Sequence, residues 1–372
     1  MREFLQQYKI RLNTIGPVFV GNGKELIKKE YILNKRARRA VIIDQTKFLR
    51  YLIKKNMLDS YERYILGKNG TLQDWMYEER ISDADLRSFT AYEYDCGNIA
   101  DLKQMKNILT FIKDPYGRPY VPGSSIKGAI RTVLLGADIL NNPSRYSRIA
   151  DYLAQEDFSD WRERRSLKRQ LEHECKRAEQ IFFCTKEKSD KNQTVNDIMN
   201  GVRISDSRQL DISDLTLCQK IDKHIDGNKR NLSILRECLK PDTLIEFDMT
   251  IDSTECQLTP EQIRSSINVF LKGYNKLFLE KFADETLYKE DVIYLGGGAG
   301  LATKTVLHEL LKDSKSRSKI IGNIIDLSLP QRAKSQHKHY LDGKTGVSPH
   351  VCKLTEYDGE LLQMGPCSIE IV

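Results

Sequence analysis

The chain is poor in histidine and tryptophan. It has six histidines and two tryptophans among 372 residues, and no histidine precedes His173. Histidine is the commonest general acid or base, and nucleophilic enzymes place it beside a serine or cysteine. No Ser/His/Asp or Cys/His arrangement can be recognised, and His337 and His339 lie in a lysine-rich stretch that indicates charge rather than chemistry. The sequence therefore predicts a protein that is not an enzyme.

Paired cysteine motifs are also lacking. None of the eight cysteines forms a Cys-x-x-Cys pair, which favours free thiols in a reducing cytoplasm. His173-x-Cys175 with Cys184 lacks a fourth ligand at a spacing that zinc sites use. We expect no metal and no cofactor.

Long apolar runs are missing as well. No stretch is long enough to cross a bilayer, and the N-terminus does not resemble a signal peptide. We expect a soluble cytoplasmic protein without a membrane partner. Its 372 residues leave room for two domains with sizeable cores.

Positive charge is present in moderate excess. The formal net charge is +7, from 59 Lys and Arg against 52 Asp and Glu. The excess concentrates in residues 24–55, with eleven basic and three acidic residues, and in residues 311–340, with seven and two. Such clusters are typical of proteins that bind polyanions, although basic faces are often only solvated.

The segment 119–135 organises the chain. Its two prolines exclude helix at the start, Gly123 allows a sharp bend, and Ser124 or Ser125 can cap the helix that follows. The apolar face of this predicted helix consists of Ile126, Ile130, Val133 and Leu134.

Two cations lie off that apolar face. Lys127 and Arg131 are four residues apart and share one side of the helix near its start. Free backbone amides and the positive end of the dipole attract phosphate there. The alternative, an ordinary capped core helix with solvated cations, stays open.

A glycine-rich loop follows the predicted strand 292–295. Its glycines at 296, 297, 298 and 300, with Lys304 in the predicted helix that continues to about 311, suit a phosphate cradle. Leu301 occupies the position of the third glycine of a dinucleotide fingerprint, and no Walker A lysine follows. A nucleotide-binding enzyme is therefore disfavoured, and a turn that serves packing alone is the alternative.

The remaining segments are less distinctive. Residues 45–66 favour a helix, and residues 67–100 lack a clean period and are interpreted as irregular or as an insertion. From about 141 to 192, mixed charge with few apolar residues indicates exposed helices inserted into a domain. Pro241-Asp242 is the preferred domain boundary.

Three short blocks carry a resemblance to a known family. Residues 121–132 (Val-Pro-Gly-Ser-Ser-Ile-Lys-Gly-Ala-Ile-Arg-Thr), residues 294–305 and residues 201–207 (Gly-Val-Arg-Ile-Ser-Asp-Ser) resemble motifs of the RAMP superfamily of CRISPR-associated RNA-binding proteins. The first two blocks, in this order and in a chain of this length, are most similar to those of the subunits that cap the crRNA 3′ end in type III-A (Csm) effector complexes.

The resemblance implies an α+β fold of two ferredoxin-like (RRM-like) RAMP domains with a charged helical insertion. Residues 1–240 would form the N-terminal domain with its insertion at about 141–200, and residues 241–372 the C-terminal domain with the glycine-rich loop.

It also implies a function in antiviral defence. The chain would be a non-catalytic RNA-binding subunit that binds the 3′ part of the crRNA, caps the backbone filament and supports crRNA maturation. Its implied partners are the backbone RAMP subunit and other Csm subunits; docking of host nucleases stays open. The predicted RNA-binding residues are Gly123, Ser124, Ser125, Lys127, Arg131, Gly296, Gly297, Gly298, Gly300 and Lys304. Arg203 and Ser205 are further candidates for a phosphate, with a strand ending in an Asx turn as the alternative.

An enzyme of the same superfamily is the alternative function. A processing endoribonuclease would need an acid or base, and His308, four residues after Lys304 on the predicted helix, is the best candidate, with a tyrosine as the other choice. Its plainer interpretation is a surface or half-buried helix residue.

Overall fold

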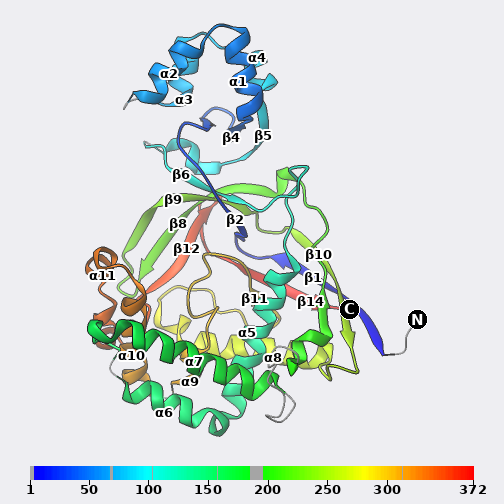
Figure 1. The fold of residues 1–372 in the computed structure, drawn as a ribbon, viewed down its shortest axis with the longest axis vertical. Helices are drawn as coiled ribbons and strands as arrows, with labels where there is room; N and C mark the ends of the chain where they lie inside the picture. The colour runs from blue at the N-terminus through cyan, green and yellow to red at the C-terminus, as the bar shows by residue number, and fades with distance from the viewer. Residues whose placement is uncertain (1–3, 68–69, 103, 157, 185–195, 312) are drawn as a thin grey trace.

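The computed structural model describes the following residues: 4–67, 70–102, 104–156, 158–184, 196–311 and 313–372. Within them the chain is an α+β protein with two curled sheets, and helices cover the first sheet and one end of the molecule (Figure 1). The predicted fold class is confirmed.

The first sheet has five strands in the order β11-β14-β1-β10-β7, and all neighbours are antiparallel. They are β1 (Leu5–Thr14), β7 (Val202–Ile204), β10 (Leu244–Asp252), β11 (Val292–Tyr294) and β14 (Pro366–Ile371). In β1 every second residue from Ile10 to Thr14 is buried, as expected for a strand with one face in the core.

The second sheet has nine strands, and β8 is its hub, paired with β9 and β12 antiparallel and with β5 parallel. They are β2 (Gly21–Leu26), β3 (Tyr31–Asn34), β4 (Arg39–Ile43), β5 (Thr90–Asp95), β6 (Asn107–Phe111), β8 (Leu215–His224), β9 (Lys229–Leu239), β12 (Val351–Tyr357) and β13 (Glu360–Gln363).

Glu237 lies on the buried face of β9 and is fully inaccessible. It accepts from Lys113 Nζ at 2.5 Å and from the Tyr92 hydroxyl at 2.7 Å. A buried carboxylate needs such partners because desolvation is costly. Its charge is therefore balanced inside the fold.

Helices α5 (Gly123–Asn141) and α8 (Pro260–Leu277) pack against each other and against the first sheet. Glycine lets them approach closely, since a Cβ on Gly136 would lie 2.4 Å from the Phe270 ring, and one on Gly273 would lie 2.6 Å from Leu140. The apolar face predicted for α5 is buried in this core.

A lobe of four short helices stands at one end of the molecule (Figure 1). They are α1 (Gln45–Lys54), α2 (Leu58–Leu66), α3 (Leu72–Glu78) and α4 (Asp83–Ser88). The predicted helix 45–66 is broken at Asn56, which has φ of +56°. Residues 67–100 are not irregular: Thr71 and Ser82 cap α3 and α4, and Trp75 packs in a separate core with Phe48 and Phe89.

The region after α5 is helical where it is described. It contains α6 (Ser147–Gln155) and α7 (Arg164–Phe183), and residues 185–195 of the predicted insertion lie outside the described residues. These helices are not wholly exposed, because Ile149, Leu153 and Leu167 join the main core.

Four further helices lie nearer the C-terminus. They are α9 (Leu307–Leu310), α10 (Ser314–Ser328), α11 (Gln331–His337) and α12 (Asp342–Thr345).

Strand pairing crosses the predicted domain boundary at residue 241 in both sheets. β1 pairs with β10 and β14, and β12 pairs with β8. The division at 241 stays a prediction, and each sheet draws strands from both sides of it. Among the described residues, no helix combines the length and apolar character needed to cross a membrane.

We predict that Gly123→Ala destabilises the protein by about 1–3 kcal/mol, as overpacking does. The added Cβ would lie 2.3 Å from the carbonyl oxygens of Ile204 and Ser205. Gly128→Ala is the matched control, because nothing lies within 4 Å of its Cβ in the same helix, and alanine is the better helix former. Urea unfolding of both variants tests this, and equal midpoints would contradict the close approach.

Candidate nucleic-acid interface

The helix of the central segment begins two or three residues earlier than a cap at Ser124 or Ser125 would require. α5 starts at Gly123, its N-cap is Pro122, and no side chain of the cap makes a hydrogen bond. The Gly123 N–H instead donates to Asp206 Oδ1 at 2.9 Å. The prediction that Ser124 or Ser125 caps the helix is wrong, because a carboxylate from a distant segment takes that place.

Two of the sequence blocks pack on each other. Ser207 Oγ accepts from the Val121 N–H at 2.9 Å, and the Ser207 N–H donates to the Val121 carbonyl at 2.9 Å. Ser205 Oγ accepts from the Asp248 N–H at 3.0 Å, while Arg203 is exposed on β7. The loop after β7 thus fixes the start of α5, and its acidic residue occupies the helix end where phosphate was expected.

Lys127 and Arg131 both have partners within the fold. Lys127 Nζ donates to the Val202 carbonyl at 2.7 Å. Arg131 bridges Asp197 at 2.7 Å and Glu179 at 2.9 Å, and its guanidinium lies 3.8 Å from the centre of the Phe183 ring. These contacts join α5 to α7 and β7. Their assignment to RNA stays a prediction, and their geometry is that of structural links.

The glycine-rich loop packs closely on the segment after β1. The Gly297 N–H donates to the Phe19 carbonyl at 2.6 Å, and a Cβ on Gly296 would lie 2.2 Å from the same oxygen. Gly298 has φ of +102° and Gly300 has φ of +101°, a region that side chains rarely tolerate. Lys304 lies in a turn and helix starts only at Leu307, so the predicted helix beginning directly after the loop is wrong.

Four cations gather beside this loop. A Cβ on Gly298 would lie 2.7 Å from Arg236 Nη1, and one on Gly300 would lie 3.6 Å from Lys353. Strand register places Lys353 opposite Asp222 and Arg236 opposite Cys218, with Lys220 between Cys218 and Asp222 on β8. Cross-strand partners and alternate residues share a face. We call Lys220, Arg236, Lys304 and Lys353 the basic cluster.

The basic cluster has little compensation. Lys353 Nζ contacts Asp222 at 2.7 Å, and Glu237 is turned to the other face of β9. Burial, then the nearby Lys353, lowers the pKa of Lys220 to about 8, against the opposing effect of Asp222. Burial and Arg236 also lower the pKa of Lys304, although that side chain reaches solvent. Such crowding of cations favours an anion as ligand.

Arg236 is the clearest sign of a missing partner. Its guanidinium lies 5.1 Å from the centre of the Phe19 ring, and Nη1 is 3.9 Å from Met364 Sδ. Among the described residues, its buried Nε has no hydrogen-bond partner. Buried donors are normally satisfied. A phosphate oxygen would satisfy a guanidinium beside a glycine loop.

His308 does not reach this surface. It is 2% exposed, and its Nε2 lies 2.7 Å from the Ser348 carbonyl. Burial lowers its pKa to about 4. It lies in α9, whereas Lys304 precedes that helix, so the two do not share a helix face. The residue therefore has neither the access nor the protonation behaviour of a surface acid or base.

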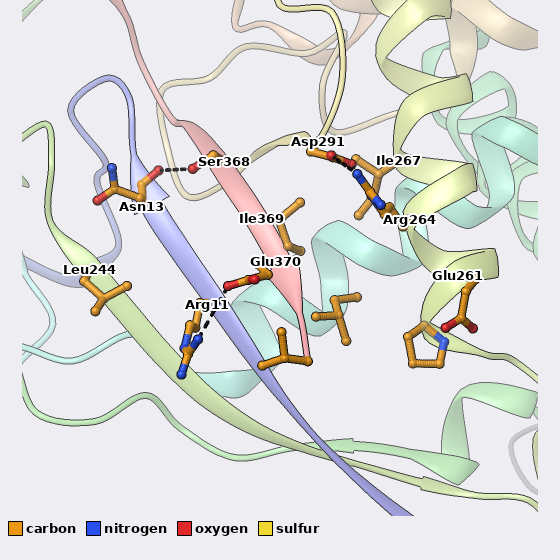
Figure 2. Close-up of a pocket in the computed structure, with 13 residues that line it drawn as sticks. Arg11, Asn13, Leu244, Glu261, Arg264, Ile267, Asp291, Ser368, Ile369 and Glu370 are labelled. Carbon is orange, nitrogen blue, oxygen red and sulfur yellow. Dashed lines mark hydrogen bonds and ion pairs between the residues drawn. The ribbon is translucent and has the colours of Figure 1, made fainter.

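Other candidate sites are less suited to a polyanion. A cavity of about 640 Å³ lies between the end of β14 and the start of α8 (Figure 2). Its cations are paired, Arg11 with Glu246 and Glu370, and Arg264 with Asp291. His173 and Cys175 are exposed on α7. Among the described residues, the group with metal-ligand spacing is His339, Asp342 and His350.

A sequence profile of the RAMP superfamily matches residues 11–302. The chain belongs to the RAMP superfamily. This RAMP chain is 28% identical over 324 residues to the "CRISPR system Cms protein Csm5" of Streptococcus thermophilus, over 83% of the chain and 82% of that protein. It is 25% identical over 400 residues to the protein of the same name from Mycobacterium tuberculosis (strain CDC 1551 / Oshkosh), over 100% and 99%.

Solved structures agree on the fold. One chain of the "Cryo-EM structure of Csm-crRNA-target RNA ternary complex in type III-A CRISPR-Cas system" matches with a TM-score of 0.67 and 18% identity, over 98% of this chain and 100% of that one. The crystal structure of T. onnurineus Csm5 matches with a TM-score of 0.57 and 16% identity, over 96% and 99%.

Most residues of the basic cluster could not be identified from the amino-acid sequence of this chain. Lys304 was identified by its place after the glycines. Lys220, Arg236 and Lys353 lie in β8, β9 and β12, where a polar residue among apolar ones is ordinary for a strand and does not mark a site. A signal was present only in Arg236, which stands with Glu237 in the mainly apolar second half of β9.

We predict that Arg131→Ala lowers stability by about 1–2 kcal/mol, because two partly exposed ion pairs and a cation–π contact are lost together. If its role is structural, RNA affinity stays within about twofold of wild type. Chemical unfolding and RNA titration measure the two effects separately. A stable variant with clearly weakened RNA binding would restore the predicted RNA contact.

Proposed function

We propose that this chain is a non-catalytic RNA-binding subunit of a type III-A CRISPR (Csm) effector complex. It would bind the 3′ part of the crRNA in the cytoplasm, cap the backbone filament and support crRNA maturation. The observation that carries the RNA-binding proposal is Arg236, which lies beside the glycine-rich loop and whose buried Nε lacks a partner among the described residues. The complete-length similarity to Csm5 proteins supports the choice of complex.

The basic cluster would bind the phosphates of the RNA backbone. The glycines at 296, 297, 298 and 300 let the loop backbone lie close to Arg236 and Lys353, and the four cations would face one anion path. Contacts of this kind position phosphates without reading bases. Sequence-independent binding with strong salt dependence follows from this arrangement. A contact of RNA with Gly123, Ser124, Ser125, Lys127 and Arg131 stays a prediction, and Lys127 and Arg131 would have to exchange their carbonyl and carboxylate partners to make it.

Non-catalytic binding fits the placement of His308. An endoribonuclease would need an acid or base beside the phosphate, and this histidine is turned to the Ser348 carbonyl inside the fold. The proposal therefore assigns binding and scaffolding to the chain and leaves cutting to partners, including any host nuclease that docks on the complex.

We predict that Lys220→Ala with Lys304→Ala weakens binding of unrelated single-stranded RNAs several-fold at physiological salt. If two phosphate contacts are lost, the slope of log affinity against log salt becomes shallower by about 1.4. Lys176→Ala, at an exposed lysine of α7, is the charge control. Fluorescence anisotropy measures affinity, and gel analysis of the same mixtures in EDTA shows whether RNA is cut.

Titration of Lys220 gives an internal control for this experiment. Its pKa of about 8 means that the ammonium is charged below that pH and neutral above it, so wild-type affinity should fall between pH 7 and pH 9.5. The Lys220→Arg variant keeps its positive charge over this range, so its affinity should fall less between pH 7 and pH 9.5.

An unchanged affinity in the double alanine variant, or a preference well over tenfold for one RNA sequence, would refute the proposed surface.

The capping role predicts a chain that ends a filament. Head-to-tail contacts that do not close propagate, so a repeating subunit needs two complementary ends and a cap needs one. The charged helices α6 and α7 would cover the other end, because dense charge is poor interface core.

We expect the isolated protein to be a monomer or a small closed oligomer, and to join the backbone RAMP subunit at one end. Light scattering of the pure chain and electron microscopy of the complex test this. Open-ended polymers of this chain, or several adjacent copies in one complex, would be incompatible with a cap.

A further inference from the structure

We propose that His339, Asp342 and His350 form a binding site for a transition-metal ion of the Zn²⁺ type, which ties the helical segment 331–345 to the end of β8 and the start of β12 in the second sheet. One potential ligand atom from each residue lies within 4.8 Å of the other two. The site is separate from the proposed RNA-binding function and does not depend on it.

Asp342 is the centre of the group. It is fully inaccessible to solvent, and its two carboxylate oxygens face different neighbours. Oδ2 lies 3.1 Å from His339 Nδ1 and accepts from Ser348 Oγ at 2.6 Å, while Oδ1 lies 2.5 Å from His350 Nδ1. Two ring nitrogens and a carboxylate thus converge on one small volume.

The ligand set selects the class of ion. Imidazole suits Zn²⁺, Cu²⁺, Ni²⁺ and Fe²⁺, whereas Mg²⁺ and Ca²⁺ prefer oxygen ligands. Ligands at about 2.0–2.2 Å from a tetrahedral zinc lie roughly 3.3 Å from one another. The separations of 2.5 and 3.1 Å run to different oxygens of Asp342 and are shorter than this, so the ion would move the two rings apart and replace their Nδ1 protons. A fourth position stays open to water or another ligand.

Surrounding groups hold the ligands in place. The His224 ring stacks on His350 at 5.3 Å between ring centres, and the His337 ring stacks on His339 at 5.9 Å. The rings of the two proposed ligands lie 4.7 Å apart. The hydroxyl of Ser348 orients the carboxylate, as outer-shell hydrogen bonds do in metal sites. Four of the six histidines therefore belong to one stack.

The site joins parts of the chain that no long strand or helix connects. His339 and Asp342 belong to the helical segment that ends with α12, and His350 directly precedes β12. His224 is the last residue of β8, the hub of the second sheet. Binding of an ion to the folded chain alone would stabilise this junction.

The test uses the tag-free full-length chain, stripped with a chelator and dialysed against ZnCl₂. We expect about one equivalent of zinc by mass spectrometry, and a melting temperature raised by about 2 °C or more with ZnCl₂ but not with MgCl₂. His339→Asn with His350→Asn should lose both effects. His173→Asn and Cys175→Ser, at exposed positions on α7, should keep them.

Cobalt substitution of the wild type keeps the test independent of variant folding. Visible bands of four- or five-coordinate Co²⁺ without a thiolate charge-transfer band would support ligation by nitrogen and oxygen. A thiolate band, no retained metal in the wild type, or equal retention by the double asparagine variant would overturn the proposal, leaving His339, Asp342 and His350 as a hydrogen-bonded junction.

Discussion

The close docking of α5 on the strand segment 204–206 is the constraint on which the rest of the structure depends. Gly123 sits where any Cβ would strike two carbonyl oxygens, and its amide is held by Asp206. This contact sets where α5 begins, and the helix then carries its apolar face across the first sheet. Because protein interiors are close-packed, a shift at this point would propagate to α8 through Gly136.

Close backbone packing also determines the position of the glycine-rich loop. Its glycines let the backbone lie against Phe19, and this brings Arg236 and Lys353 from two strands of the other sheet to the loop. Charge is separated across β9: Glu237 is paired on the buried face, while Arg236 on the opposite face keeps an unsatisfied donor. An unbalanced cationic face is costly in a folded protein and is consistent with an anionic partner.

Much of the fold could be predicted because local rules and tertiary packing agree there. The apolar face of α5 and the α+β class follow from periodicity and from short motifs. Residues 67–100 could not be predicted, because α3 and α4 are too short to show a long period, and the aromatic core in which they pack is shared with α1. The prediction of a serine cap was wrong for a related reason. The Gly123 N–H donates to Asp206, which lies 83 residues away in sequence, so no local pattern could indicate it.

The sequence by itself determined the family, the class of fold and the presence of a glycine loop, since these depend on residue types at short spacing. Only the tertiary structure decided which cations are available. The sequence marked Lys127 and Arg131 as candidates and did not mark Lys220, yet Lys127 and Arg131 meet carbonyl and carboxylate oxygens inside the fold, while Lys220 and Arg236 lie in the cluster beside the loop. The strength of an ion pair depends on the distance between its two charges. Strand register and helix packing determine these distances, so residue types at short spacing do not give them.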